Sequence, residues 1–182
     1  PFKKSDSLVN AIKALPEVRL VNEYATKSAI LKTEDEIEGV IFKGVTKNYS
    51  WKMLQPFLIS GSIISFPDSA YSDQIIISSY FAEKLKLKLH DKVIVYFIQQ
   101  EGAAPRPRVL YIGGIYKTSI EEYDQTYVIG DLRLIAHMNN WQPDEIGGYE
   151  IFLHDFNKMD TVNNLIYENY LPDTLTSITI KQ

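Results

Sequence analysis

The residue types that carry most protein chemistry are sparse in this sequence of 182 residues. Cysteine is absent, which excludes disulfide scaffolds, thiolate zinc sites and cysteine nucleophiles. The histidines are His90, His137 and His154, and none has a second histidine three or four positions away. Because zinc-binding histidine pairs use that spacing, we expect no metal site. The sequence also lacks a glycine-rich phosphate loop and a Gly-x-Ser-x-Gly elbow, so it predicts neither nucleotide binding nor a serine hydrolase.

The densest group of carboxylates is Glu121, Glu122 and Asp124. Such a group can hold a cation or supply an acid–base pair. The favoured interpretation is a solvated turn that caps the neighbouring structure, because no nucleophile and no metal-binding set accompanies it. A stand-alone enzyme with these carboxylates in a cleft stays as an alternative. We expect no catalytic residue and no cofactor.

Charge and composition bound the partners. The hydrophobic fraction of 45% and the charged fraction of 23% are ordinary for a globular protein. The net charge of −4 argues against nucleic acid or an anionic membrane as the main partner. Residues 83–108 carry six basic and three acidic side chains, whereas residues 119–160 carry two basic and nine acidic ones. The basic stretch could receive an acidic protein, although counts along the chain need not form a patch in space.

The most suggestive segment is Gln99 to Arg108, at the tip of an expected hairpin formed by residues 92–116. Its Pro105, Arg106, Pro107 and Arg108 predict a stiff, extended arm that carries permanent positive charge. Because of its prolines, we expect residues 100–107 to form no regular structure. A stiff arm loses little entropy on docking, so it suits partner binding. The alternative is a proline-containing loop that blunts a strand edge.

Local patterns predict alternating helices and strands. Ser5-Asp6-Ser7 can cap a helix that ends at Pro16, and Asp131 can cap another that closes at Trp141. An aromatic-rich group is expected to pack as core under a loop, a ligand platform being the alternative; it comprises Tyr49, Trp51, Met53, Leu54 and Phe57. Further helices are expected at 79–85 and 157–170, and strands at 18–31, 37–45, 74–78, 92–99, 109–116, 126–129, 148–153 and 174–180.

Several motifs share an order and spacing with a known family. Gln-Ile-Ile-Ile-Ser at 74–78 is followed by Phe-Ala-x-x-Leu at 81–85 and Asp-Lys-Val-Ile-Val at 91–95. Tyr-Ile-Gly-Gly-Ile-Tyr at 111–116 and Glu-Tyr-Asp at 122–124 come later. Together with the strand at 40–45, they resemble the extracytoplasmic core domain of FtsX-like and MacB-like ABC-transporter permeases. Glu-Tyr-Asp followed by Tyr127-Val128 is similar to the lipoprotein-releasing (LolC/LolE-type) branch.

The resemblance implies an α+β domain in two parts. A porter-like α/β part with a β-α-β unit would comprise residues 1–56 and 145–182, and a β-rich Sabre-like part would be inserted at 57–144. In that family the domain lies between the first and second membrane helices and faces the periplasm from the inner membrane. It has no enzymatic site, since ATP is hydrolysed on a separate cytoplasmic subunit. The chain starts at Pro1 and its apolar runs are too short to cross a membrane, so we expect a piece of a longer protein.

The implied function is that of a lipoprotein-releasing permease, which pairs with a partner permease and passes lipoprotein cargo to a soluble periplasmic carrier. The hairpin that carries the carrier-binding hook in that branch corresponds to the short arm here. We therefore expect partner contacts at Gln99, Gln100, Pro105, Arg106, Pro107 and Arg108. The short arm favours an alternative, a MacB-like efflux or mechanotransmission domain that contacts an adaptor protein. We expect the isolated domain to be a monomer.

Overall fold

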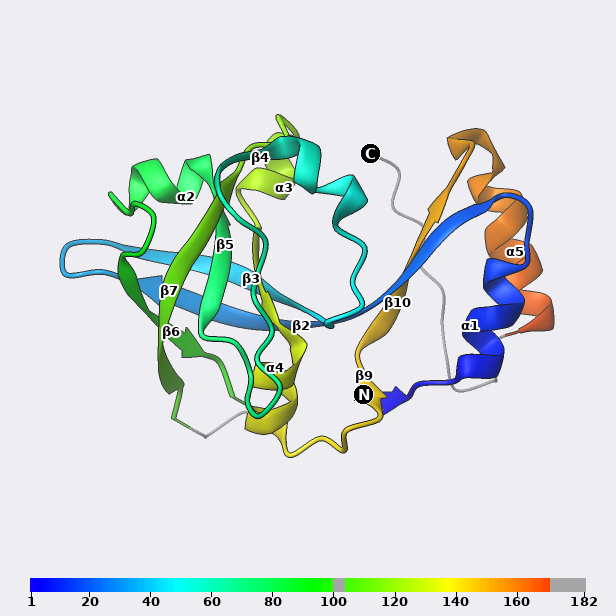
Figure 1. Cartoon of the computed structure of the whole chain (residues 1–182), viewed down its shortest axis with the longest axis horizontal. Helices are drawn as coiled ribbons and strands as arrows, with labels where there is room; N and C mark the ends of the chain where they lie inside the picture. The colour runs from blue at the N-terminus through cyan, green and yellow to red at the C-terminus, as the bar shows by residue number, and fades with distance from the viewer. Residues whose placement is uncertain (100–103, 171–182) are drawn as a thin grey trace.

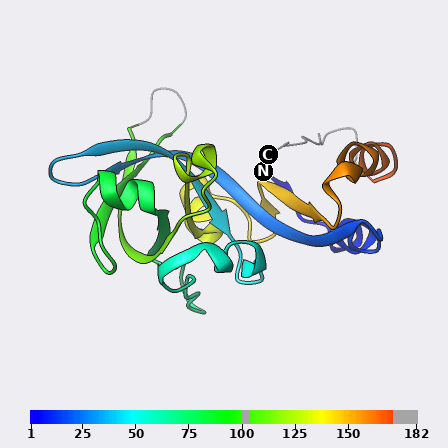
Figure 2. The same cartoon turned by 90° about the horizontal axis from the view of Figure 1, so that it is seen from above.

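Strand β2 (Val18–Lys32) runs through both lobes of an elongated molecule (Figures 1 and 2). The computed structural model describes residues 1–99 and 104–170. The larger lobe holds most strands, and the smaller lobe holds two helices and one strand. Within the described residues, no helix is long and apolar enough to span a bilayer.

The larger lobe is a closed barrel of six strands. β2 pairs with β3 (Ile37–Val45), which pairs with β8 (Tyr127–Asp131). β5 (Gln74–Ser78) meets β8 at the single pair Ile76–Ile129 and runs parallel to β7 (Arg106–Tyr116). β6 (Lys92–Phe97) closes the circle because it pairs with both β7 and β2. β4 (Leu58–Gly61) is added outside this circle, on β7.

The barrel interior is the main core. Alternate residues of β6, among them Val93, Val95 and Phe97, are at most 1% exposed, as strand alternation requires when one face is buried. Helices α2 (Ser79–Lys84) and α4 (Leu132–Asn139) close opposite ends of the barrel with apolar side chains such as Phe81 and Ile135 (Figure 1). The short helix α3 (Glu121–Asp124) precedes β8.

The outside of the barrel is covered in part by the segment after β3. Two single-turn 3-10 helices, η1 (Trp51–Met53) and η2 (Gln55–Phe57), lie in this segment. Tyr49, Trp51 and Leu54 are buried against β5, β7 and β8, which confirms the expected packing role of these three. Phe57 is 42% exposed.

The smaller lobe packs helix α1 (Asp6–Lys13) and helix α5 (Met159–Asn169) beside β10 (Gly148–Leu153) and the start of β2. β10 and β2 are antiparallel. Ile12, Val18, Val162 and Ile166 form a separate small core. The short strands β1 (Phe2–Lys3) and β9 (Glu145–Ile146) pair below it, and the single-turn η3 (Phe156–Lys158) leads into α5.

Most expected elements are confirmed. Ser5 accepts a hydrogen bond from the Leu8 backbone NH at 3.2 Å, and Asp131 caps α4. The expectation that residues 100–107 form no regular structure is wrong at its end, because β7 begins at Arg106 and pairs there with β6. A proline is tolerated at that point since the ring nitrogen of Pro107 need not donate to the ladder. The expected strand at 174–180 lies outside the described residues.

The predicted boundaries of the two parts, at residues 57 and 144, stay a prediction. The second half of β2 and most of β3 share the barrel core with residues of the predicted inserted part, for example Phe42 with Ile75 and Val95. The two strands therefore link the two predicted parts through continuous backbone.

Candidate functional site

The predicted arm is mostly a strand end. Arg106, Pro107 and Arg108 lie opposite Phe97, Tyr96 and Val95 in the β6–β7 ladder. Pro105, Arg106 and Pro107 are exposed, and Gln99 is half-buried. The Gln99 side chain donates to the Phe97 carbonyl at 3.1 Å. Gln100 lies outside the described residues.

The two arginines of this segment differ in their bonding. Arg106 Nη1 donates to the Met138 carbonyl, near the end of α4, at 3.0 Å. A cation there satisfies a terminal carbonyl and opposes the helix dipole. Arg108 Nη1 donates to the carbonyl of its own neighbour Pro107 at 2.8 Å. Arg106 therefore ties β7 to α4, whereas Arg108 is bonded only locally.

A buried lysine joins the two lobes. Lys43 of β3 is 5% exposed, and its Nζ forms an ion pair with Glu150 Oε1 of β10. Tyr49 Oη donates to Glu150 Oε2 at 3.3 Å. The Lys43 Nζ also lies 5.7–5.9 Å from three ring centroids, those of Tyr24, Tyr49 and Tyr123. Cation–π contact and the carboxylate together compensate for the loss of hydration.

Lys43 and Glu150 were not among the predicted site residues. The available signal was a lysine inside the apolar strand 40–45, where a charge requires a partner. The partner could not be read from the sequence, since it lies 107 positions away.

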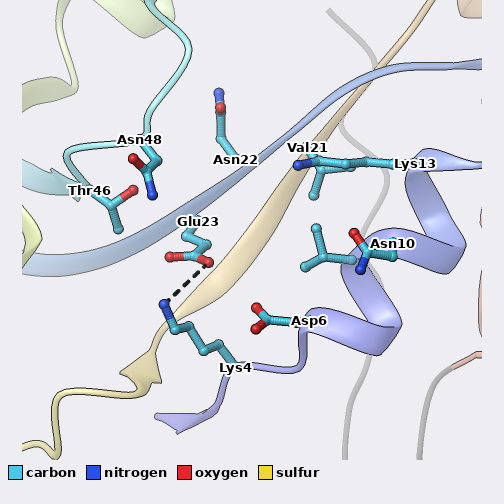
Figure 3. Close-up of a pocket in the computed structure, with 10 residues that line it drawn as sticks. Lys4, Asp6, Asn10, Lys13, Val21, Asn22, Glu23, Thr46 and Asn48 are labelled. Atoms are coloured by element: carbon cyan, nitrogen blue, oxygen red, sulfur yellow. Dashed lines mark ion pairs between the residues drawn. The ribbon is translucent and has the colours of Figure 1, made fainter.

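A polar cleft of about 230 Å³ lies beside this junction, between α1, β2 and the segment after β3. Figure 3 shows Lys4 and Glu23 facing one another, with a distance of 3.9 Å between Nζ and Oε1. Asp6 and Asn10 of α1 line the same cleft. The buried Asn22 accepts a bond from the Ser50 NH at 3.0 Å, while its Nδ2 has no partner among the described residues. The boundary between the lobes is thus polar in this region.

The carboxylate group predicted as a capped turn is one in part. Asp124 is 7% exposed and accepts hydrogen bonds from the backbone NH groups of Thr118 and Ser119 and from the Thr118 hydroxyl. Glu121 and Glu122 are exposed. In the described part of the chain, no three histidine or carboxylate side chains gather as a metal site would require.

Burial raises the pKa of Tyr49, Tyr116 and Tyr123 well above the usual 10.0. Desolvation is the largest cause in each. The negative charge of Glu150 is the second cause for Tyr49 and Tyr123. The unfolded chain therefore loses these protons first as the pH rises through 10, so stability is intact below that pH and falls above it.

Replacing Tyr49 with phenylalanine removes one of these protons. Above pH 10 the wild-type protein loses about 1.4 kcal/mol of stability per pH unit for each such tyrosine. We expect the Tyr49→Phe variant to lose stability more gently by about that amount per unit. Urea unfolding between pH 9 and about pH 11 measures the slope. Tyr167→Phe, at a side chain that is 59% exposed, is the control. Equal slopes for Tyr49→Phe and wild type would contradict the prediction.

No protein-family model matches the chain, and a search of curated proteins finds no match. Solved structures do match. One is the extracellular domain of the noncanonic ABC-type transporter YknZ from Gram-positive bacteria, with 18% identity, a TM-score of 0.55, and coverage of 92% of this chain and 84% of that one. Another is the periplasmic region of MacB from Actinobacillus actinomycetemcomitans, with 11% identity, a TM-score of 0.54, and coverage of 92% and 75%. The fold implied by the motifs, a mixed α+β fold of the MacB-like periplasmic type with a large mixed sheet, is confirmed.

Proposed function

We propose that this chain is the extracytoplasmic domain of an ABC-transporter permease, set in the inner membrane and facing the periplasm. Its work would be to bind a partner and to transmit motion driven by ATP hydrolysis on a cytoplasmic subunit. The observation that carries the proposal is the fold shared, over 92% of the chain, with the domains of two ABC transporters.

The two-lobed structure supports a mechanical role. In the proposed division, residues 1–56 and 145–182 form a porter-like part and residues 57–144 a Sabre-like part. β2 and β3 begin in the first part and pack in the barrel core of the second. The Lys43–Glu150 ion pair adds a side-chain link between β3 and β10. Movement of the smaller lobe would therefore reach the barrel through continuous strands and not through a flexible linker.

The finer proposal is a lipoprotein-releasing permease that docks a soluble carrier at the arm, with a second permease copy as its partner. The supporting observation is that Pro105, Arg106 and Pro107 are exposed at the open end of the β6–β7 hairpin. Their chemistry fits an acidic partner surface. Gln99, Gln100 and Arg108 complete the proposed contact.

A second candidate is a MacB-like efflux or mechanotransmission domain that contacts an adaptor protein. One observation favours it: most of the described arm lies within a strand ladder, which leaves little chain to reach around a carrier. The fold match to MacB itself is in keeping with this candidate.

The test uses the complete permease with its ATPase in proteoliposomes, with a purified carrier and a purified adaptor offered separately. Arg108→Glu is the informative variant because Arg106→Glu would also break the bond to the Met138 carbonyl. We expect Arg108→Glu to weaken carrier binding about tenfold at low salt. Arg19→Glu reverses an exposed charge on the smaller lobe and serves as the control.

Three outcomes decide between the proposals. Carrier binding that Arg108→Glu does not change rules out docking at the arm. Binding of the adaptor and not of the carrier selects the MacB-like candidate. ATP hydrolysis that responds to neither protein overturns the transporter proposal itself.

A further inference from the structure

One side of the barrel exposes a continuous apolar surface, called here the outer wall. It is formed by the outward side chains of β3, β2, β6 and β7. One row crosses all four strands through directly paired residues: Ile37, Lys32, Ile94 and Val109. Ile37 is 60% exposed, Val109 51% and Ile94 37%. Apolar side chains exposed in one continuous patch mark an interaction surface more often than scattered ones do.

The adjoining rows extend the same chemistry. Gly39, Ile30, Tyr96 and Pro107 form the next row across the four strands. On the other side of the first row, Tyr111 lies opposite Lys92 and is 43% exposed. Alternate residues of these strands point into the barrel core, so the outer wall is not a by-product of poor packing.

The backbone of the outer wall is already paired. β6 has β2 on one side and β7 on the other, so its ladder hydrogen bonds are used on both edges. A partner therefore cannot add a strand within the wall. It must dock through side chains, as a helix or a second sheet does.

A shallow hollow of about 200 Å³ adjoins the wall at Gly39 and Ile41, and Gln125 and Thr126 form its other side. A side chain placed at Gly39 would meet no atom within 4 Å. The hollow can accept one projecting apolar side chain of a partner, which gives the flat wall a fixed point of registration.

The charged side chains among these outward positions are Lys32 and Lys92. Both are exposed, and neither forms an ion pair within the described part of the chain. An apolar strip with unpaired cations complements an apolar strip with carboxylates beside it. An anionic membrane fits less well, because the turn directly after Lys32 places the exposed carboxylates of Glu34 and Asp35 beside the wall.

We infer that the outer wall docks an amphipathic helix of a protein partner, whose apolar stripe lies across Ile94 and Val109 and whose flanking carboxylates pair with Lys32 and Lys92. The inference deepens the proposed function and rests on it for the role of the partner. The surface is separate from Arg108, whose side of the strand faces the barrel interior opposite Val95.

The test uses this chain and two designed helical peptides of about 18 residues, or about five turns. Both carry the same leucine stripe; one has glutamates beside it and the other has lysines. Fluorescence anisotropy gives the affinities. We expect the glutamate peptide to bind at least about tenfold more tightly than the lysine peptide. In the Lys32→Glu/Lys92→Glu variant the preference should reverse.

Val109→Glu should abolish binding of the glutamate peptide, whereas Ile59→Glu, at a side chain that is 60% exposed on β4, should leave it unchanged. Circular dichroism checks that both variants are folded. Equal binding of the two peptides, or the same effect of both variants, overturns the inference. Tighter binding to vesicles that contain anionic lipid than to the glutamate peptide, or dimers that Val109→Glu dissociates, would assign the wall to a membrane or to a second copy and also overturn it. None of these outcomes bears on whether the complete permease couples to its ATPase.

Discussion

Replacing Glu150 with glutamine should lower the free energy of unfolding by about 3 kcal/mol, which corresponds to a fall in Tm of roughly 6–12 °C for a domain of this size. The reason is that Lys43, whose side chain is 6% exposed, would keep its charge and lose its carboxylate. The three tyrosine rings near its Nζ cannot replace a full negative charge. Urea unfolding followed by circular dichroism measures the change.

An exposed ion pair provides the matched control. Lys47 and Asp68 lie 3.1 Å apart with side chains 70% and 95% exposed, so Asp68→Asn should change stability by at most about 0.5 kcal/mol. Removing both buried charges tests the cause directly. The Glu150→Gln/Lys43→Met variant should regain most of the stability that Glu150→Gln loses, because no unpaired charge remains. A double variant less stable than Glu150→Gln would show that the unpaired lysine is not responsible.

Local patterns were sufficient for most of the elements. Ser5 and Asp131 carry side chains that cap a helix, and the alternation of 92–97 specifies which face of β6 is buried. The closed barrel could not be predicted in this way. Pairing of β6 with β2 joins Phe97 to Ala29, and an apolar strand pattern states that a neighbour is needed without stating which one.

The candidate site shows the same limit. Pro105 to Arg108 looked like a free arm because prolines disfavour a strand interior, yet β7 extends through Pro107. What decides this is the bond from Arg106 to the Met138 carbonyl and the pairing with β6, both of which are tertiary contacts. Lys43 is a clearer case, since its partners come from β2, β10 and the segments around η1 and α3, and their convergence follows from the barrel topology.

Asp131 illustrates both what a sequence pattern predicts and what it omits, and its removal should be nearly as costly as that of Glu150. As the cap of α4 it accepts from the Arg133 NH at 2.9 Å; its other oxygen accepts from the buried Ser72 NH at 2.8 Å and from Arg133 Nη2 at 2.7 Å.

Asp131→Ala loses a cap worth about 1 kcal/mol and leaves the Ser72 NH unpaired, which costs about 1–3 kcal/mol more, so we expect a loss of about 3 kcal/mol. Asp155 is the control, since it caps η3 from an exposed position and accepts only from Asn157. Asp155→Ala should cost at most about 1 kcal/mol in the same urea unfolding experiment. Equal costs at the two positions would mean that the bond to Ser72 contributes nothing, and that the loop before β5 is held in place by its apolar contacts alone.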